Sequence, residues 1–159
     1  MANRKPRYNT VMDLPFGRVA IVADANGLSS IDLVSGKTPL QSPDNPSARK
    51  ICRALRQYVR EPMTRFDLPL NVIGTEFQKK VWRELEKIPP GKPLTYGALA
   101  KRLKTSARAI GGACRENPVP IIVPCHRVTG ATDRGGYMGQ TRGRAVQMKD
   151  WLLSHEDLD

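Results

Sequence analysis

Cys125, His126 and Arg127 stand side by side at the end of a mostly apolar stretch and could do nucleophilic chemistry together. A cysteine reacts as the thiolate, and a neighbouring base or cation must lower its pKa from about 8.5. His126 is the base next to the sulfur in sequence, and Arg127 adds positive charge. These residues predict a nucleophilic cysteine. The competing interpretation is a small buried side chain, since free cysteine is among the most buried residue types.

The stretch that leads to Cys125, residues 117–124, predicts an extended, stiff and buried segment. It holds three prolines among apolar residues. Each proline fixes its own φ and lacks a backbone donor, and it disfavours helix in the residue before it. Adjacent side chains of an extended strand point to opposite faces. A direct contact between Cys125 and His126 would therefore need a turn or a bridging water.

A histidine that acts as a general base also needs an acceptor that orients its ring. Spacing alone does not choose that acceptor. The candidate carboxylates are Glu116 and Asp133, which are nearest in sequence, and Glu156, Asp157 and Asp159 near the C-terminus.

The first 72 residues carry no chemical motif and predict a scaffold. Asn26-Gly27 is a strong hairpin signal between two strand-like runs. A helix follows with apolar residues at helical spacing and basic residues between them, and Cys52 falls on its apolar face, which indicates a structural role. The expected elements are strands at 19–23, 28–34 and 66–72 and a helix at 49–60.

The second half contains three signals for the start of a helix. Thr75 with Gln78 forms a capping-box pattern, and Thr95 and Ser106 are plausible N-caps. The last two helices are joined by a short turn, and the final one, which runs to Arg115, is basic and rich in small residues. This is the helix-turn-helix pattern, whose second helix approaches DNA closely. A glycine-rich loop at 135–139 and an amphipathic helix at about 144–155 are expected to follow, with Val146, Met148, Trp151, Leu152 and Leu153 facing the core.

The charge of the chain indicates a polyanionic partner. The formal net charge is +11, and residues 79–115 carry ten Lys or Arg against two Glu. Nucleic acid is the commonest polyanion, and a solvated surface without a partner would intersperse the two signs. We therefore expect a polyanion-binding face in this part of the chain.

Cysteine usage and hydropathy favour an intracellular protein. The three cysteines, at positions 52, 114 and 125, are an odd number without metal-ligand spacing, which is typical of free thiols in a reducing compartment. No apolar run approaches the 18 or so residues that span a bilayer. We expect an intracellular protein with no membrane partner.

Several blocks of the second half resemble the O6-alkylguanine-DNA alkyltransferases, also called methylated-DNA–protein-cysteine methyltransferases. The similarity covers about residues 73–156, while residues 1–72 match only in size and character. Its central block is Pro124-Cys125-His126-Arg127-Val128, preceded by Asn117-Pro118-Val119-Pro120. The other blocks are residues 77–82, 88–91, 95–96, 107–113 and 151–156.

The resemblance implies a single-turnover reaction without a cofactor. The Cys125 thiolate would attack the alkyl carbon on O6 of a guanine that has left the DNA stack, and the product would be a stable thioether. It also implies that His126 takes the Cys125 proton through water, that Glu156 orients His126, and that Asn117 ties the recognition helix to the active-site strand.

The remaining site residues are also implied by the resemblance. Tyr96 would donate to guanine N3, the carbonyls of Cys125 and Val128 would accept from its exocyclic amine, and Tyr137 with the Met138 amide would cover the base. Arg108 would enter the stack in place of the flipped base. Met138 stands where a small residue is common, and the loop 139–143 is long. The expected DNA-binding set is Arg108, Thr95, Ser106, Ala107, Gly111 and Arg115.

The resemblance implies an α/β (α+β) fold with two domains. Residues 1–72 would form a ribonuclease-H-like scaffold of a small sheet and a helix. Residues 73–159 would form a mostly helical domain with a winged-type helix-turn-helix that binds DNA and transfers the alkyl group. The expected partner is double-stranded DNA containing O6-alkylguanine, and we expect a cytoplasmic monomer that acts on chromosomal DNA. Some members of this family bind structural zinc through a Cys/His set that residues 1–72 lack, so we expect no metal.

Two other functional classes compete with this assignment. A non-catalytic protein that binds alkylated bases would flip the lesion without repairing it, but such proteins replace the reactive cysteine. A helix-turn-helix regulator would need base-reading polar side chains, whereas residues 107–113 are mostly Ala and Gly.

Overall fold

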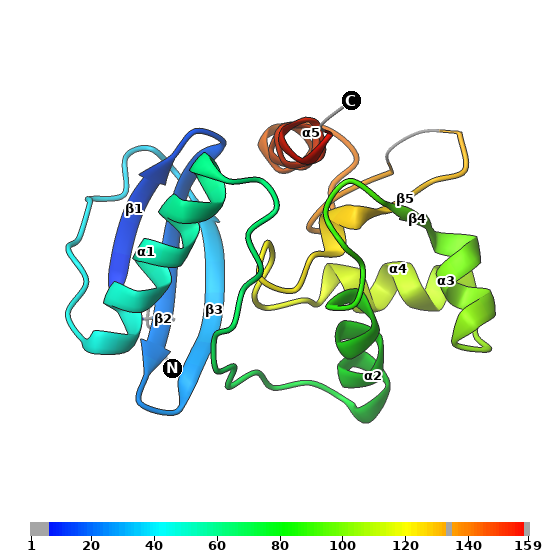
Figure 1. The fold of residues 1–159 in the computed structure, drawn as a ribbon, viewed down its shortest axis with the longest axis horizontal. Helices are drawn as coiled ribbons and strands as arrows, with labels where there is room; N and C mark the ends of the chain where they lie inside the picture. Colours follow the sequence, from blue (N-terminus) through cyan, green and yellow to red (C-terminus); the bar gives the residue numbers. More distant parts are fainter. Residues whose placement is uncertain (1–6, 133–134, 158–159) are drawn as a thin grey trace, which may run out of the picture. The chain divides into compact units, whose positions relative to one another are not determined.

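The computed structural model describes residues 7–132 and 135–157. Within these residues the chain has five α-helices, a three-stranded antiparallel sheet and a short two-stranded pair (Figure 1). It divides into two compact units, one up to Ile73 and one from Gly74 onward. The expected mixed α/β class is confirmed.

The sheet of the first unit has its strands in chain order. β1 (Thr10–Leu14), β2 (Gly17–Asp24) and β3 (Gly27–Val34) pair antiparallel, with β2 in the centre. The expected hairpin is confirmed, although its two-residue turn is Ala25-Asn26 because Asp24 pairs with Gly27. β1 is an additional strand that the sequence patterns did not single out.

Helix α1 (Pro46–Arg60) lies against this sheet and contacts all three strands (Figure 1). It begins three residues before the expected start, because the Asn45 side chain accepts the Ala48 N–H and Pro46 occupies the first helical position. Its buried face consists of Ala48, Ile51, Cys52, Leu55 and Tyr58. The structural interpretation of Cys52 is therefore confirmed.

The strand expected at 66–72 does not form. Only one bridge joins this segment to β3, with the Leu28 N–H donating to Pro69 O at 2.9 Å and the Asn71 N–H donating to Leu28 O at 2.8 Å. Pro69 has no N–H and cannot extend a ladder. Gly27 is required opposite it, because φ is +125° and a Cβ there would lie 2.6 Å from Pro69 O.

The second unit begins with α2 (Glu76–Leu85), α3 (Tyr96–Arg102) and α4 (Ala107–Arg115). All three expected caps are confirmed. Thr75 and Gln78 form the capping box, the Thr95 side chain accepts the Ala98 N–H, and Ser106 accepts the Ala109 N–H. The buried Trp82 indole of α2 donates to Ala113 O of α4 at 2.9 Å and fixes the two helices together.

The turn between α3 and α4 is a Schellman motif with an unusual residue. The Thr105 N–H donates to Ala100 O at 2.9 Å and the Lys104 N–H donates to Lys101 O at 3.3 Å. Lys104 has φ +55°, the left-handed conformation that glycine normally supplies at this position. The short expected turn is therefore present, with some backbone strain at Lys104.

The prediction of an extended segment before Cys125 is wrong. Residues 120–123 make a turn in which the buried Ile121 has φ +78°, and Cys125–Arg127 form a 3-10 turn, η1. Prolines prevent an α-helix here, but they do not prevent sharp turns. The chain then enters β5 (Val128–Thr129), which pairs parallel with β4 (Leu94–Thr95).

Helix α5 (Arg144–Glu156) closes the second unit. Met148, Leu152 and Leu153 are buried as expected, but Val146 and Trp151 are only half-buried, and Trp151 stacks on His155. The buried stripe instead runs through Ala145, Met148, Lys149, Leu152, Leu153 and Glu156. Two charged side chains therefore lie on the core face of this helix.

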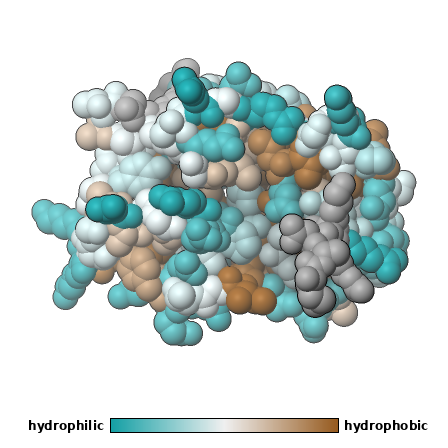
Figure 2. Space-filling view, turned by 180° about the vertical axis from the view of Figure 1, so that it is seen from behind, coloured by the Kyte–Doolittle hydropathy of each residue, from teal (hydrophilic) through white to brown (hydrophobic). Residues whose placement is uncertain are grey.

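The surface is largely hydrophilic. Figure 2 shows one face, on which hydrophilic side chains surround small separate hydrophobic patches. Among the described residues, no helix has the length and apolar character that crossing a bilayer requires.

Candidate active site

Cys125 lies at a pocket of the second unit that has a volume of about 310 Å³. The thiol is 3% exposed, so a ligand would reach it only through this pocket. Seven of the residues that the sequence singled out line the pocket together: Tyr96, Arg108, Gly111, Arg115, Cys125, Tyr137 and Met138.

Asn117 holds the sulfur from the other side. Its side-chain amide donates to Cys125 Sγ at 3.1 Å and to Val123 O at 2.8 Å, and its Oδ1 accepts the Val119 N–H at 3.0 Å. Asn117 therefore fixes both ends of the turn that delivers Cys125. An N–H that donates to sulfur stabilises a thiolate more than a thiol.

The surroundings of the sulfur shift the pKa of Cys125 in opposite directions. Burial raises the pKa of Cys125, while the hydrogen bond from Asn117, the charge of Lys149 and the Tyr137 side chain lower it. Burial has the larger effect, so the resting residue is a thiol. Transfer to an electrophile therefore requires a base that removes the proton at the moment of reaction.

His126 and Glu156 form a buried pair behind the cysteine. His126 Nε2 lies 2.7 Å from Glu156 Oε2, and both residues are almost fully buried. Burial lowers the pKa of His126 more than the carboxylate raises it, so the imidazole is neutral. In a neutral ring whose Nε2–H donates to Glu156, Nδ1 is the acceptor. Nδ1 has no hydrogen-bond partner among residues 7–132 and 135–157.

Glu156 is therefore the carboxylate that contacts His126, out of the five that sequence spacing left open. Glu116 and Asp157 are exposed, and Asp133 and Asp159 lie outside the described residues. The choice required the fold, because α5 brings Glu156 to a histidine 30 positions earlier in the chain.

Arg127 fixes the same carboxylate. Its guanidinium donates to Glu156 Oε1 at 2.8 Å and to Oε2 at 3.0 Å, and also to Ile88 O at 2.7 Å. Burial raises the pKa of Glu156, but the hydrogen bonds from His126 and Arg127, together with the charge of Arg127, outweigh it and lower the pKa to about 2. Glu156 is therefore ionised, and its position is set by two partners.

Lys149 is a site residue that the sequence patterns missed. It is fully buried, and its Nζ donates to Val128 O at 2.7 Å and to Gly136 O at 2.9 Å, and lies 5.6 Å from the centre of the Tyr96 ring. It thereby joins β5 and the loop over the pocket to α5. Its spacing from Ala145 and Leu153, four residues to either side, could have placed it on the buried stripe.

The loop over the pocket has a strained backbone at Met138, a residue that lines the pocket. Tyr137 and Gln140 bond to each other through both backbone groups, at 2.8 and 2.9 Å. The two central residues, Met138 and Gly139, have φ +53° and +77°. This is the type I′ geometry, which favours Asn or Gly at the first central position. Met138 is held there with its side chain on the pocket wall.

The second unit matches a family of DNA-repair proteins. Residues 76–158 match the model described as 6-O-methylguanine DNA methyltransferase, DNA binding domain. The chain is 36% identical to the methylated-DNA–protein-cysteine methyltransferase of Methanosarcina acetivorans over 156 residues, which is 94% of this chain and 97% of the relative. The chain belongs to the methylated-DNA–protein-cysteine methyltransferase family.

Solved structures agree with this methyltransferase assignment. The O6-methylguanine methyltransferase of Mycobacterium tuberculosis has a TM-score of 0.79 at 29% identity, covering 95% of this chain and 93% of that one. The OGT protein of the same organism in complex with DNA has a TM-score of 0.77 at 32% identity, covering 92% and 90%. The similarity therefore extends through both units.

Helix α4 presents the residues expected to contact DNA in a methyltransferase. Ala107, Arg108 and Arg115 are exposed. A Cβ built on Gly111 or Gly112 would meet nothing within 4 Å, so these glycines are not required by packing inside the protein. Thr95 and Ser106 use their hydroxyls to cap α3 and α4. Their side chains are therefore already hydrogen-bonded.

Val128 and Cys114 differ from their expected roles at the methyltransferase site. Val128 does not line the pocket; its carbonyl accepts from Lys149 and its N–H donates to Cys125 O. Cys114 lines the pocket, although the sequence patterns gave it no role. Burial is the main cause that raises the pKa of the Cys114 thiol far above its usual value.

Within the described parts of the chain, no group of three or more His, Cys, Asp or Glu side chains is arranged to hold a metal ion. The donors that a metal would need are already paired, since His126 and Glu156 bond each other. The expected absence of a metal and of a cofactor stays a prediction.

Proposed function

We propose that this protein repairs DNA by transferring the alkyl group of O6-alkylguanine to Cys125 Sγ, once per molecule. The observation that carries the proposal is the position of Cys125. Its sulfur borders a pocket of about 310 Å³, receives an N–H from Asn117 and has a neutral histidine next to it in sequence. These features suit in-line attack on an alkyl carbon: a sulfur–carbon bond forms, and the carbon–O6 bond breaks.

The Cys125 proton passes to His126 in this proposal. The imidazole is neutral, and Nδ1, which has no hydrogen-bond partner among the described residues, is its basic nitrogen. A bridging water carries the proton from Sγ to Nδ1, and the imidazolium that forms is stabilised by the ionised Glu156 at Nε2. Glu156 does not touch the substrate; it is a positioning residue, and Arg127 in turn positions Glu156.

The pocket residues recognise the guanine and help it to leave. The Tyr96 hydroxyl donates to N3 and the Met138 amide donates to O6, so the negative charge that develops on the base meets two donors. Lys149 adds a buried cation near Tyr96. The Cys125 carbonyl accepts from the exocyclic amine through its second lone pair, and Tyr137 covers the base. The Val128 carbonyl, which does not line the pocket, holds Lys149 instead.

The α3–α4 pair binds the duplex as a winged-type helix-turn-helix. The open space over Gly111 and Gly112 supports close approach of a DNA groove. Arg108 fills the place of the flipped base, and Arg115 together with backbone amides at Thr95, Ser106 and Ala107 contacts phosphates. The unit from Gly74 onward then carries DNA binding and transfer, and the first unit is a ribonuclease-H-like scaffold. The protein works as an intracellular monomer.

The test is transfer of label from a duplex containing O6-[methyl-³H]methylguanine to the protein. We expect one label per molecule on Cys125, none on the Cys125→Ser variant, and unchanged transfer to the control variant Cys52→Ser, whose cysteine lies in α1 of the first unit. Absence of label on the unmodified protein would contradict the proposal. Duplex binding by Cys125→Ser without label transfer separates a reactive residue from a structural one.

The role of Arg108 has a separate test. Arg108→Ala should slow repair within a duplex by at least about tenfold, because base flipping loses its wedge at a cost of a few kcal/mol. Transfer from free O6-benzylguanine should slow much less. Both reactions should stay unchanged in Arg65→Ala, which replaces an exposed arginine of the first unit. An equal loss on duplex and free base would remove Arg108 from this role.

Neither competing class gains support from the site. A non-catalytic reader of alkylated bases has no use for a buried thiol with a dedicated N–H donor. The function of a helix-turn-helix regulator does not require a pocket lined by that thiol. Label transfer decides between these classes.

A further inference from the structure

Helix α1 of the first unit carries a row of arginines on its exposed side. Arg49, Arg53, Arg56 and Arg60 are all exposed. They are spaced at i, i+4, i+7 and i+11, which places them on one stripe of the helix within about 60° and over a length of roughly 16 Å. We call these four residues the arginine stripe. Lys50, also exposed, lies beside it.

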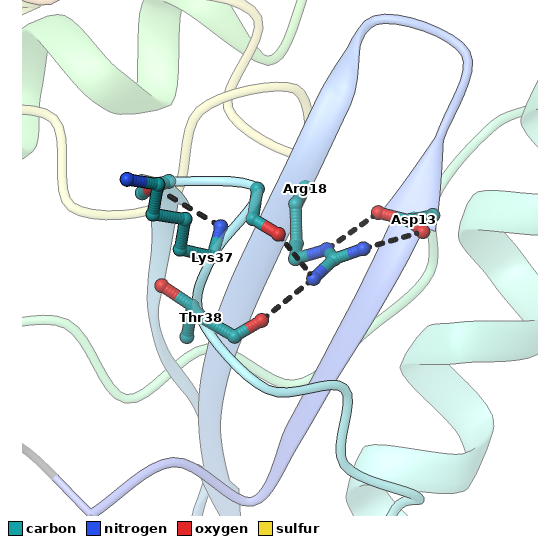
Figure 3. Close-up of polar contacts among 6 residues, drawn as sticks. Asp13, Arg18, Lys37 and Thr38 are labelled. Carbon is teal, nitrogen blue, oxygen red and sulfur yellow. Dashed lines mark hydrogen bonds and ion pairs between the residues drawn. The ribbon is translucent and has the colours of Figure 1, made fainter.

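The arginine stripe has no acidic counterpart. The 15-residue helix contains no Asp or Glu, and no ion pair to any of its basic residues is formed within residues 7–132 and 135–157. Asp13 lines the same groove as Arg56, but both of its oxygens are taken by Arg18, at 2.7 and 2.9 Å (Figure 3). The stripe therefore presents four uncompensated charges to solvent.

This arrangement is unfavourable for the helix itself. Like charges at i, i+3 and i, i+4 destabilise a helix, and cations near its N-terminus oppose the helix dipole. A helix selected only for solubility would interleave Glu at these spacings. An uninterrupted row of arginines is explained by a partner that supplies the negative charge.

The chemistry of the stripe favours a phosphate backbone over a lipid surface. Guanidinium groups bind phosphates through two parallel hydrogen bonds. A helix that inserts into a membrane interface also needs a free apolar face. The apolar face of α1, which contains Ile51, Leu55 and Tyr58, is already buried against the sheet. Duplex DNA presents a charge about every 1.7 Å of its axis, so several phosphates lie within the length of the stripe.

We propose that the arginine stripe of α1 is a second, sequence-independent DNA-binding surface, separate from the helix-turn-helix of the other unit. It binds backbone phosphates and contributes to affinity for undamaged and damaged duplex alike. DNA as the ligand follows from the proposed function, but the stripe takes no part in alkyl transfer.

The test compares three variants that have matched charge or matched position. The stripe variant is Arg53→Gln/Arg56→Gln/Arg60→Gln, in which glutamine keeps helix propensity. Its control is Arg7→Gln/Lys37→Gln/Arg65→Gln, with the same loss of charge at exposed positions of the same unit outside α1. The third variant, Arg53→Lys/Arg56→Lys/Arg60→Lys, keeps the charge on the stripe.

Binding of each variant to an undamaged 30-base-pair duplex is measured by fluorescence anisotropy between 50 and 300 mM NaCl. Each lost phosphate contact reduces the slope of log Kd against log salt by about 0.9. We expect the stripe variant to lose about 2 to 3 from this slope, while the control and the lysine variant lose less than about 1. A stripe-variant slope equal to that of the unmodified protein or of its control overturns the proposal.

Transfer from free O6-benzylguanine to Cys125 shows that each variant is folded and should be the same in all of them. If the unmodified protein transfers no label while the stripe still changes the salt slope, the proposed function fails and the stripe stands. Binding of the stripe to anionic vesicles without a change in the DNA slope would assign it to a lipid surface and overturn the proposal.

Discussion

Glu156 is the residue on which chemistry and stability meet. One carboxylate holds the His126 ring at 2.7 Å and the Arg127 guanidinium at 2.8 Å, away from solvent. Breaking a buried pair by removing one partner typically costs about 3–5 kcal/mol, because a charge is left buried without its counterion. Replacement of Glu156 should therefore affect the whole second unit as well as the reaction.

The low pKa of Glu156 predicts acid sensitivity. Its folded-state pKa, about 2, lies below the ordinary value of 4.5, so its stabilising effect is complete above pH 4.5 and is lost as the pH falls toward 2. The loss amounts to about 3 kcal/mol of unfolding free energy. Urea unfolding at pH 5 and pH 3 should show about 2 kcal/mol of this loss in the unmodified protein and a smaller loss in Glu156→Gln. Equal losses would show that another group causes the acid sensitivity.

Asn117 should control the pKa of the nucleophile. Its N–H is the largest of the contributions that lower the pKa of Cys125. In Asn117→Ala the thiolate loses a hydrogen bond worth about 1.5–3 kcal/mol, which corresponds to a 10- to 100-fold slower transfer from free O6-benzylguanine at pH 7. The pH–rate profile should also move to higher pH. A purely structural role of Asn117 would lower the rate or the stability without moving the profile, and Asn71→Ala, at an exposed position, should change neither.

At the scale of the elements, the turn between α3 and α4 places Lys104 in a backbone conformation that a lysine does not favour. Lys104 adopts φ +55° at the position where a Schellman motif usually has glycine. Lys104→Gly should raise the unfolding free energy by about 0.5–1 kcal/mol. The left-handed conformation costs a residue with a side chain about 1–2 kcal/mol, and the greater freedom of glycine in the unfolded chain offsets about half of the gain. Lys101→Gly, inside α3, should lower it by a similar amount. Urea unfolding measures both, and a destabilised Lys104→Gly would mean that the lysine side chain makes a stabilising contact.

Local elements could be predicted from the sequence where the signal itself is local. Thr75, Thr95 and Ser106 cap helices through contacts three residues away, and each was identified from its neighbours. The turn at Ile121 could not be found in this way, because a β-branched residue at positive φ contradicts local preference. It is held by contacts of Asn117 with residues on both sides of the turn.

For the molecule as a whole, the charge distribution distinguishes two kinds of substrate. The net charge of +11 includes both the α4 region and the arginine stripe. Transfer from a duplex should therefore slow steeply between 50 and 300 mM NaCl at subsaturating DNA, because phosphate contacts release counterions. Transfer from free O6-benzylguanine, an uncharged ligand, should vary little. Parallel salt curves for the two substrates would mean that salt acts on the active site instead of on DNA binding.

The long-range parts of the site were the least accessible to sequence reasoning. Cys125, His126 and Arg127 are adjacent and were found by their types. Lys149 is different, because its function depends on Val128 and Gly136, which lie 21 and 13 positions away. A lysine in an amphipathic helix is normally exposed, and only the fold shows that its ammonium has partners inside.

The shared carboxylate also determines what can be learned by selecting variants for folding alone. In many enzymes the catalytic residues destabilise the fold, so a screen that selects only for stability allows other residues to replace them. Here a library screened only for resistance to proteolysis, with no DNA present, should retain Glu156 and Arg127, because both are needed to keep the buried pair intact. The same library should accept serine or alanine at Cys125. A selection for folding alone would thus conserve Glu156 and Arg127, which position the general base, but would not conserve the nucleophile Cys125.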